Sequence, residues 1–182
     1  TPGTAAQAGS GIYIHSGSPT VENCIFTDNI AFDGGAIYIQ SGSPIIKNCQ
    51  FYHNSALNEG GAINGYIPGA YIVDRCWFAD NKALNGGAIA NQYSQLSQTL
   101  LVKNSVFQGN YASGAGFSGG GAVYNYDNIN AEYINCTFAG NRATSYGGAI
   151  FTMSGGGGDV LKNCIIWGNA AATSGMNLLD TF

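Results

Sequence analysis

Five cysteines recur at one position of a repeating pattern, and they are the residues whose type and spacing could support redox or metal chemistry. The five are Cys24, Cys49, Cys76, Cys136 and Cys164. Neighbours one repeat apart would lie within the Cα distance that a disulfide spans, but side chains stacked in register point in parallel, which is poor geometry for a bridge. The chain has no C-x-x-C pair or Cys/His cluster of the kind that binds zinc. We therefore expect a buried ladder of thiols that fills space as small apolar side chains do.

Three ionisable side chains also share one position, directly before a repeated asparagine. They are Asp28, His53 and Asp80. On successive coils these groups could line up and hold a divalent cation. The simpler interpretation, which we favour, is three solvated turn residues, so we expect neither a metal nor a cofactor. The G-x-G-x-x-G match at residues 114–119 lies in a loop, without the strand and helix that a dinucleotide site needs.

Charged residues offer little for the cleavage of a polysaccharide. The column two residues before the cysteine position holds Glu22, Lys47, Asp74, Lys103, then Ile134 and Lys162. Charges alternate along this column, and opposite charges on neighbouring strands stabilise strand pairing modestly. We find no column that places two acids on adjacent coils beside a base, and so no paired carboxylates of the glycosidase type. We therefore expect a protein that is not an enzyme.

Outward aromatic side chains offer a better binding surface. The position one residue after the isoleucine of a Gly-Gly-Ala-Ile motif, or of its counterpart, supplies the candidate contacts Tyr13, Tyr38, Tyr124 and Phe151. Further rings that could add to this surface are Tyr52, Trp77, Tyr93, Tyr111, Tyr126, Tyr146 and Trp167. Such rings can stack on a glycan or pack against a partner protein.

A repeat that runs through the chain must position all of these residues. An F-x-x-N motif, with Ile in place of Phe in the last copy, ends at Asn29, Asn54, Asn81, Asn110, Asn141 and Asn169. The spacings run from 25 to 31 residues with a mean of 28. The aromatic column of the motif is Phe26, Phe51, Phe78, Phe107 and Phe138. A Gly-Gly-Ala-Ile or Gly-Gly-Ala-Val block follows five of the copies.

This repeat predicts an all-β fold, a parallel β-solenoid. Each unit is too short to bury an apolar face alone, so it must stack on its neighbours. Short alternating segments such as GAIYI read as strands, and Gly-Gly and Ser-Gly-Ser-Pro read as turns. We expect about six coils with three short strands per coil, in one domain over residues 1–182, with loop insertions near 92–99, 111–119 and 154–159. A helical repeat would need longer apolar stretches of period 3.6, and Gly-Gly in nearly every unit speaks against it.

The composition excludes two classes of partner. Charged residues make up 9% of the chain and the net charge is −4, with six Lys and Arg in total. A nucleic-acid binder needs a basic face, which six such residues cannot supply. The longest apolar runs are a few residues long, so we expect no insertion into a membrane.

The alternation of Gly-Gly-Ala-Ile/Val with Phe-x-x-Asn resembles the repeats of polymorphic outer membrane proteins, the passenger domains of chlamydial autotransporters. The motifs extend over nearly the whole chain. The resemblance implies a right-handed parallel β-helix used for surface display or adhesion, in a bacterial protein that is secreted, extracellular or at the cell surface.

Two functions of different classes follow from these observations. The first is a non-catalytic structural protein, either an adhesin-like display module or a fibre subunit whose copies stack end to end. Its partners would be other copies of itself, or a host or matrix surface. The alternative is a β-helix that binds or degrades a glycan through outward aromatics and scattered carboxylates.

Overall fold

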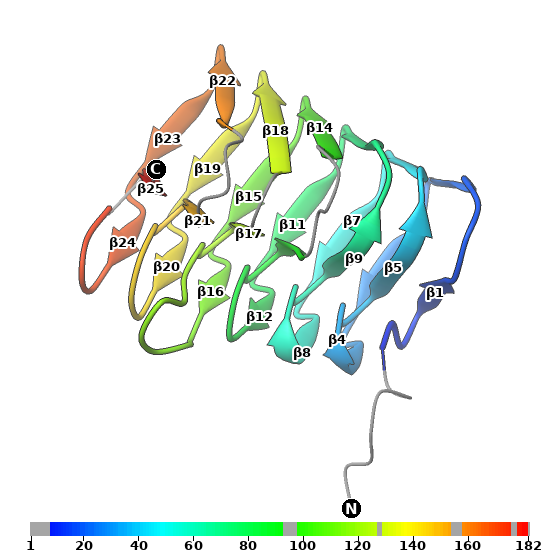
Figure 1. Cartoon of the computed structure of the whole chain (residues 1–182), viewed down its shortest axis with the longest axis horizontal. Coiled ribbons are helices and arrows are strands. Elements are labelled where there is room, and N and C mark those ends of the chain that lie inside the picture. The colour runs from blue at the N-terminus through cyan, green and yellow to red at the C-terminus, as the bar shows by residue number, and fades with distance from the viewer. Residues whose placement is uncertain (1–7, 93–97, 127–128, 154–157, 176–177, 182) are drawn as a thin grey trace, which may run out of the picture.

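The computed structural model describes residues 8–92, 98–126, 129–153, 158–175 and 178–181. These residues form strands and turns only, stacked as successive coils along the long axis of the molecule (Figure 1). Among them there is no helix long and apolar enough to cross a membrane. The prediction of an all-β parallel solenoid is therefore confirmed.

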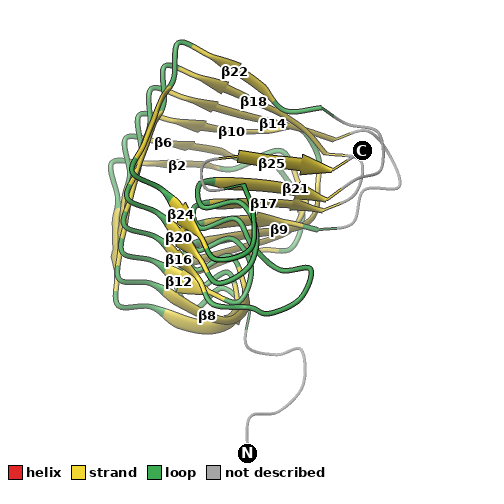
Figure 2. Ribbon diagram, turned by 90° about the vertical axis from the view of Figure 1, so that its left-hand side faces the viewer, coloured by secondary structure: helices red, strands yellow, loops and turns green. Residues whose placement is uncertain are grey.

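The strands form four parallel sheets, each with one strand from every coil, seen as rows in Figure 2. Sheet A contains β1 (Ile12–Ile14), β5 (Ile37–Gly42), β9 (Ile63–Pro68), β13 (Ile89–Asn91), β17 (Val123–Tyr126), β21 (Ile150–Met153) and β25 (Leu178–Thr181). Sheet B contains β2 (Thr20–Glu22), β6 (Ile45–Lys47), β10 (Tyr71–Asp74), β14 (Gln98–Lys103), β18 (Ile129–Ile134) and β22 (Val160–Lys162). Sheet C contains β3 (Ile25–Thr27), β7 (Gln50–Tyr52), β11 (Trp77–Ala79), β15 (Val106–Gln108), β19 (Thr137–Ala139) and β23 (Ile165–Trp167). Sheet D contains β4 (Ile30–Asp33), β8 (Ser55–Glu59), β12 (Lys82–Ala83), β16 (Tyr111–Ala112), β20 (Arg142–Ala143) and β24 (Ala170–Ala171).

Each coil has four strands, not the three that the repeat suggested. Sheets B, C and D each hold six strands of the described chain, which agrees with about six coils and encloses five complete turns. The extra break comes at the repeated asparagine, where the preceding residue adopts a left-handed backbone, as Asp28 does with φ of 56°. That conformation cannot continue a strand, so the segment divides into one strand in sheet C and one in sheet D.

Apolar ladders form the core, because parallel pairing in register sets identical residues above one another. The Phe column pairs in register from coil to coil, and its rings stack with centroids 4.7 to 4.9 Å apart and planes within 6° of parallel. Isoleucine and valine of sheets A and B fill the rest, with Ile37, Ile63 and Ile89 fully buried. This core fixes the positions of the outward faces.

The asparagine column forms a second ladder, of hydrogen bonds. Asn81 Oδ1 accepts from both the backbone N and the Nδ2 of Asn54, each at 3.0 Å. Asn81 Nδ2 in turn donates to Asn110 Oδ1 at 2.9 Å and to the carbonyl of Phe51 at 3.0 Å. The same pattern runs from Asn29 to Asn169. A buried side chain thus takes up the backbone groups that the sharp corner leaves unpaired.

The expected loop insertions fall partly on residues outside the described chain, namely 93–97 and 154–157. In the remaining insertion, expected near 111–119, Tyr111 and Ala112 still belong to β16, so the insertion begins at residue 113. It ends at Gly119, which bridges to Tyr146 on the next coil. The single-domain assignment over 1–182 stays a prediction.

Candidate functional site

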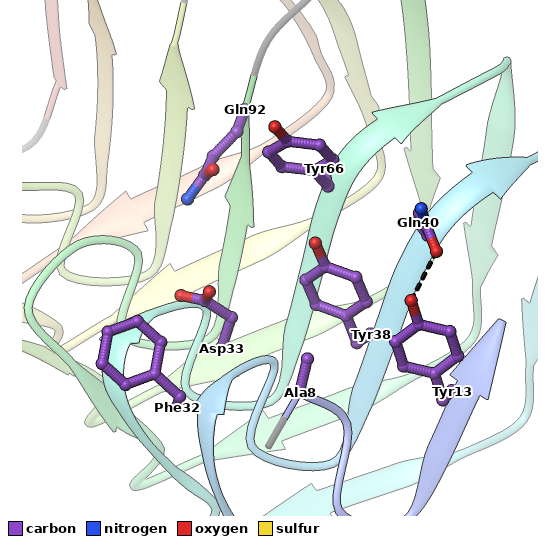
Figure 3. A pocket seen from close by; sticks show the side chains of 8 residues that line it. All are labelled: Ala8, Tyr13, Phe32, Asp33, Tyr38, Gln40, Tyr66 and Gln92. Carbon is purple, nitrogen blue, oxygen red and sulfur yellow. Dashed lines mark hydrogen bonds between the residues drawn. The ribbon is translucent and has the colours of Figure 1, made fainter. Parts of the chain in front are cut away.

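A groove of about 430 Å³ lies between the outward face of sheet A and the end of β4 (Figure 3). Its volume is in the range of small-molecule sites. Strands β1, β5 and β9 supply one wall with Tyr13, Tyr38 and Tyr66, and the end of β4 supplies the other with Phe32 and Asp33. The lining residues are Ala8, Tyr13, Phe32, Asp33, Tyr38, Gln40, Tyr66 and Gln92.

Three tyrosines form the aromatic wall of this groove. Tyr13 and Tyr38 pair in register on β1 and β5, and their rings stack with centroids 5.4 Å apart and planes 17° apart. Tyr66 follows Tyr38 at 6.4 Å and 23°. The Tyr13 hydroxyl also donates to Gln40 Oε1, which holds the amide at the rim. Tyr13 and Tyr38 were both predicted as surface contacts, and Tyr13 is 50% exposed.

Two carboxylates meet on adjacent coils at the opposite wall. Asp33 and Glu59 pair in register at the ends of β4 and β8. Asp33 Oδ1 accepts hydrogen bonds from Asn58 Nδ2 at 3.0 Å and from the Glu59 backbone N at 3.1 Å. This pair of acids on adjacent coils went unrecognised in the sequence, where only two acids beside a base were sought, and no Lys, Arg or His among the described residues lines the groove next to it. The signal was present, because Asp33, Glu59 and Asn85 are the residues that directly precede successive Gly-Gly pairs.

Burial makes this pair of carboxylates electrostatically unusual. Desolvation raises the pKa of Glu59 from its ordinary 4.5 to about 7, the charge of Asp33 adds to the rise, and polar contacts from Gln92 and Asn85 oppose it. Desolvation also raises the pKa of Asp33, against the hydrogen bonds from Asn58 and the Glu59 backbone. Among the described residues no side chain lies within hydrogen-bond distance of the buried Glu59 Oε2. Burial therefore shifts both carboxyl groups toward the protonated form, and of the two it is Asp33 that lines the groove.

Asn64 is a second polar side chain that sequence reasoning missed. It lies on β9 in register between Tyr38 of β5 and Ala90 of β13, on the outward face of sheet A. It is fully buried, and within the described chain neither Oδ1 nor Nδ2 has a hydrogen-bond partner. An unpaired buried amide costs about 1–3 kcal/mol, so Asn64 lowers the stability of the fold where it stands. The sequence does contain a sign of it, because Asn64 is the one polar residue at a repeat position that otherwise holds aromatic or aliphatic residues.

Two of the four predicted surface aromatics are not on the surface. Tyr124 is 4% exposed and Phe151 is 1% exposed, although both belong to the outward column of sheet A. Phe151 packs against Tyr124 at 5.6 Å and Tyr146 at 5.5 Å. Gly119, at the end of the longest described insertion, lies against the Phe151 ring. The longer turns of the later coils therefore cover this part of the face, and the groove stays open only over the earlier coils.

The three ionisable residues before the asparagines do not come together as a metal site. Asp28, His53 and Asp80 are exposed and have φ between 53° and 56°. Asp, Asn and His tolerate this left-handed conformation better than most residues, and glycine occupies the position in the later coils, for example at Gly109. In the part of the chain that is described, no group of three His, Cys, Asp or Glu residues could hold a metal ion. The turn geometry accounts for these residue types.

The cysteine column lies inside the corner between sheets B and C. All five cysteines are free thiols, with Cys49, Cys76 and Cys136 buried and Cys24 and Cys164 partly exposed. The hydrogen bond between the Cys49 and Cys76 thiols, together with burial, raises the pKa of Cys76. Burial likewise raises the pKa of Cys136 to about 11. Cys76 and Cys136, held protonated in this way, are poor nucleophiles, whereas the hydrogen bond from Cys76 lowers the pKa of Cys49 to about 6.

The charged column of sheet B forms surface ion pairs. Lys47 Nζ lies 2.9 Å from Glu22, and Lys103 Nζ lies 3.7 Å from Asp74. Lys162 instead pairs with Glu132, which lies elsewhere on β18. The exposed pairs are worth about 0–1 kcal/mol each, whereas Asp74 is buried, and all of them link neighbouring strands of sheet B.

Comparison with known proteins agrees with the coil architecture. The family described as right handed beta helix region matches residues 4–130. The Chlamydia polymorphic membrane protein repeat matches residues 135–153, which confirms the resemblance seen in the motifs. No curated protein and no solved structure matches the chain. Since the first match spans more than half of the sequence and the strands form a parallel solenoid, the chain belongs to the right-handed β-helix family.

Proposed function

We propose that this chain is a non-catalytic, adhesin-like display module at the bacterial surface or secreted from it, and that it contacts its partner through the groove of sheet A. The observation that carries the proposal is the groove itself. It combines a stack of tyrosine rings with the carboxylate of Asp33 and the amides of Gln40 and Gln92. The matched polymorphic membrane protein repeat supports the surface location.

A rigid frame makes such a groove suitable for recognition. The phenylalanine stack and the asparagine ladder fix each coil against the next, and Tyr13 and Tyr38 are carried on paired strands rather than on loops. A binding surface that is already ordered loses little conformational entropy when a partner arrives. Tyrosine also offers a large contact area at low entropy cost.

Binding of the purified chain to host cells, extracellular-matrix proteins and glycan arrays tests this function. Tyr13→Ala should weaken the binding because it removes the most exposed ring of the groove. Trp167→Ala is the matched control, since Trp167 is 73% exposed on sheet C, outside the groove. Absence of binding to every surface would refute the proposal. Loss in the Trp167 variant with none in the Tyr13 variant would refute the groove as the contact site.

The paired carboxylates favour a second candidate, a polysaccharide-degrading enzyme. Glu59, with its pKa near 7, has the protonation behaviour of a general acid, and Asp33 is its in-register neighbour. A reducing-sugar assay on a panel of polysaccharides tests this candidate. Activity that disappears in Glu59→Gln would favour the enzyme, and the absence of released sugar with all substrates would favour the display module.

A further inference from the structure

A second groove, of about 370 Å³, lies outside the corner at which sheet B turns into sheet C. It extends over three successive coils, those of β7, β11 and β15, which lie side by side (Figure 1). The side chains that line it include Asn48, Gln50, Arg75, Trp77, Asn104 and Val106. Each coil passes through sheets A, B, C and D in turn, so this corner lies across the coil from the groove of sheet A.

Arg75, on the middle coil, departs from the repeat. The same corner position holds asparagine in the other coils, at Asn23, Asn48, Asn104, Asn135 and Asn163. All of these residues adopt a left-handed backbone, with φ of 51° at Arg75 and between 52° and 57° at the asparagines. Asparagine adopts this conformation more readily than arginine does. The middle coil therefore carries a cation at a corner where the neighbouring coils carry amides.

Two contacts hold the Arg75 guanidinium in one orientation. Its Nε donates to Asn48 Oδ1 at 2.8 Å, and its Nη1 lies 3.3 Å from Asp74 Oδ2. Among the described residues the guanidinium has no other such contact, and the Arg75 side chain is 56% exposed. Since a guanidinium has five N–H donors, at least three of them remain for a ligand.

The surroundings of this groove are positively charged, although the chain as a whole carries −4. Three of its six Lys and Arg residues lie here, namely Lys47, Arg75 and Lys103, because the two lysines flank Asp74 in register. Glu22 pairs with Lys47 at 2.9 Å, while Asp74 is shared by Arg75 and Lys103. Three cations thus face two carboxylates, and of the described residues that line the groove none is Asp or Glu. An anionic group is therefore attracted to this corner.

Trp77 gives the groove an apolar ring next to the cation. It follows Arg75 by two residues, is 43% exposed, and makes a T-shaped contact with Tyr52 at 5.7 Å between ring centroids. Gln50 pairs with Trp77 in register, and its Oε1 accepts from the Tyr52 hydroxyl at 2.9 Å, which leaves its amide donors for a ligand. A sugar ring satisfies both residues, because its C–H face packs on an indole and its hydroxyls accept hydrogen bonds. A nucleic acid would need a longer basic stripe.

We propose that this groove binds a carboxylated sugar of an acidic glycan, with Arg75 pairing with the carboxylate, Trp77 packing on the sugar ring and Gln50 donating to its hydroxyls. A planar guanidinium matches a carboxylate in bidentate geometry, and such hydrogen bonds are stronger than those between neutral groups. The site is a second contact surface, separate from the groove of sheet A, and does not depend on the function proposed for that groove.

The chain has two tryptophans, Trp77 and Trp167, so NMR of the indole N–H groups observes the site directly. The acidic probes are methyl β-D-glucuronide and the methyl glycoside of N-acetylneuraminic acid, and methyl β-D-glucoside is the neutral control. We expect at least one acidic glycoside to shift the Trp77 signal, to leave the Trp167 signal in place, and to bind at least tenfold more tightly than the glucoside. The tighter of the two acidic probes identifies the source of the carboxylate as a uronic or a sialic acid.

Two results would overturn the assignment. The first is equal binding of the acidic and neutral glycosides, or binding of none of them, because the carboxylate would then contribute nothing. The second concerns Nα-acetyl-glutamate methylamide, which carries a carboxylate without a sugar ring. If it shifts Trp77 and binds as tightly as the better acidic glycoside, the sugar assignment fails and an acidic peptide is the ligand.

Variants with matched controls test the two central residues, with affinity followed from the NMR signals of the glycoside. Arg75→Asn restores the residue that the repeat has at this corner, so it keeps the fold while it removes the cation, and it should weaken binding at least tenfold. Arg142→Gln removes the same charge from the exposed face of sheet D and should leave the affinity unchanged. Trp77→Ala should weaken binding about three- to tenfold, whereas Trp167→Ala should not. An equal loss in the Arg75 and Arg142 variants, or no loss in Arg75→Asn, would refute the site.

The outcomes for this site and for the proposed function can be separated. If the chain adheres to cells in a Tyr13-dependent way but no acidic glycoside shifts Trp77, the display function stands and this site fails. If an acidic glycoside binds in an Arg75-dependent way but the chain adheres to no surface, this site stands and the display function fails.

Discussion

Replacing Glu59 with glutamine should stabilise the folded protein at pH 8. Burial raises the pKa of Glu59 from 4.5 to about 7, so the folded state holds this proton more tightly than the unfolded chain does. The contribution of Glu59 to stability is therefore most favourable below about pH 4.5 and is lost as the pH rises toward 7. A pKa difference of about 2.5 corresponds to about 3 kcal/mol at pH 8, where the carboxylate is charged and buried.

Glutamine keeps the shape of the side chain and removes the charge, so it should recover most of that cost. The polar contacts from Gln92 and Asn85 favour the carboxylate and will be partly lost, which lowers the expected gain to about 2 kcal/mol at pH 8. At pH 5 the wild-type carboxyl is mostly protonated, and the two proteins should then differ by less than about 0.5 kcal/mol.

Denaturant unfolding of both proteins at pH 5 and pH 8 measures these differences. Glu22→Gln is the control, because Glu22 is an exposed carboxylate paired with Lys47 and should show no comparable gain at pH 8. The reasoning is refuted if the Glu59 variant is less stable than wild type at pH 8 and this deficit is larger than at pH 5. That result would show that the charge of Glu59 stabilises the fold.

Three further predictions concern the ladders. Asn81→Ala should destabilise the fold by several kcal/mol in denaturant unfolding, because it leaves the buried N–H of Asn54 without its acceptor; a loss below about 1 kcal/mol would mean that water replaces the side chain. Phe78→Ala should cost about 3–5 kcal/mol in the same assay, since its fully buried ring stacks on both neighbours in the column; a small cost would indicate that the stack collapses around the gap. Brief alkylation of the native protein, read out by mass spectrometry, should label the partly exposed Cys24 before the buried Cys76. Modification of all five cysteines should require unfolding, and rapid labelling of Cys76 in the native protein would contradict its burial.

The sequence by itself determined the coil and its ladders. Parallel pairing in register places residues one repeat apart directly above each other, so a column in the sequence becomes a row in space. This reasoning is sufficient to place Phe51 on Phe78 and Asn54 on Asn81, as the structure does. It also explains why Asp28 and His53 occupy one position, once the left-handed corner is recognised.

The outward faces required the tertiary structure, for two physical reasons. The position of a residue in the repeat shows whether its side chain points inward or outward from its strand, but not whether a turn covers it. Tyr124 and Phe151 were therefore predicted on the surface, although the structure buries both. The groove joins the face of sheet A to the end of β4 in sheet D, and the short turn between β4 and β5, which places Asp33 and Tyr38 in one groove, cannot be seen in a column of the repeat. A repeat therefore determines which residues stack, whereas the path of the chain around each coil determines which stacks face one another and which remain open to a ligand.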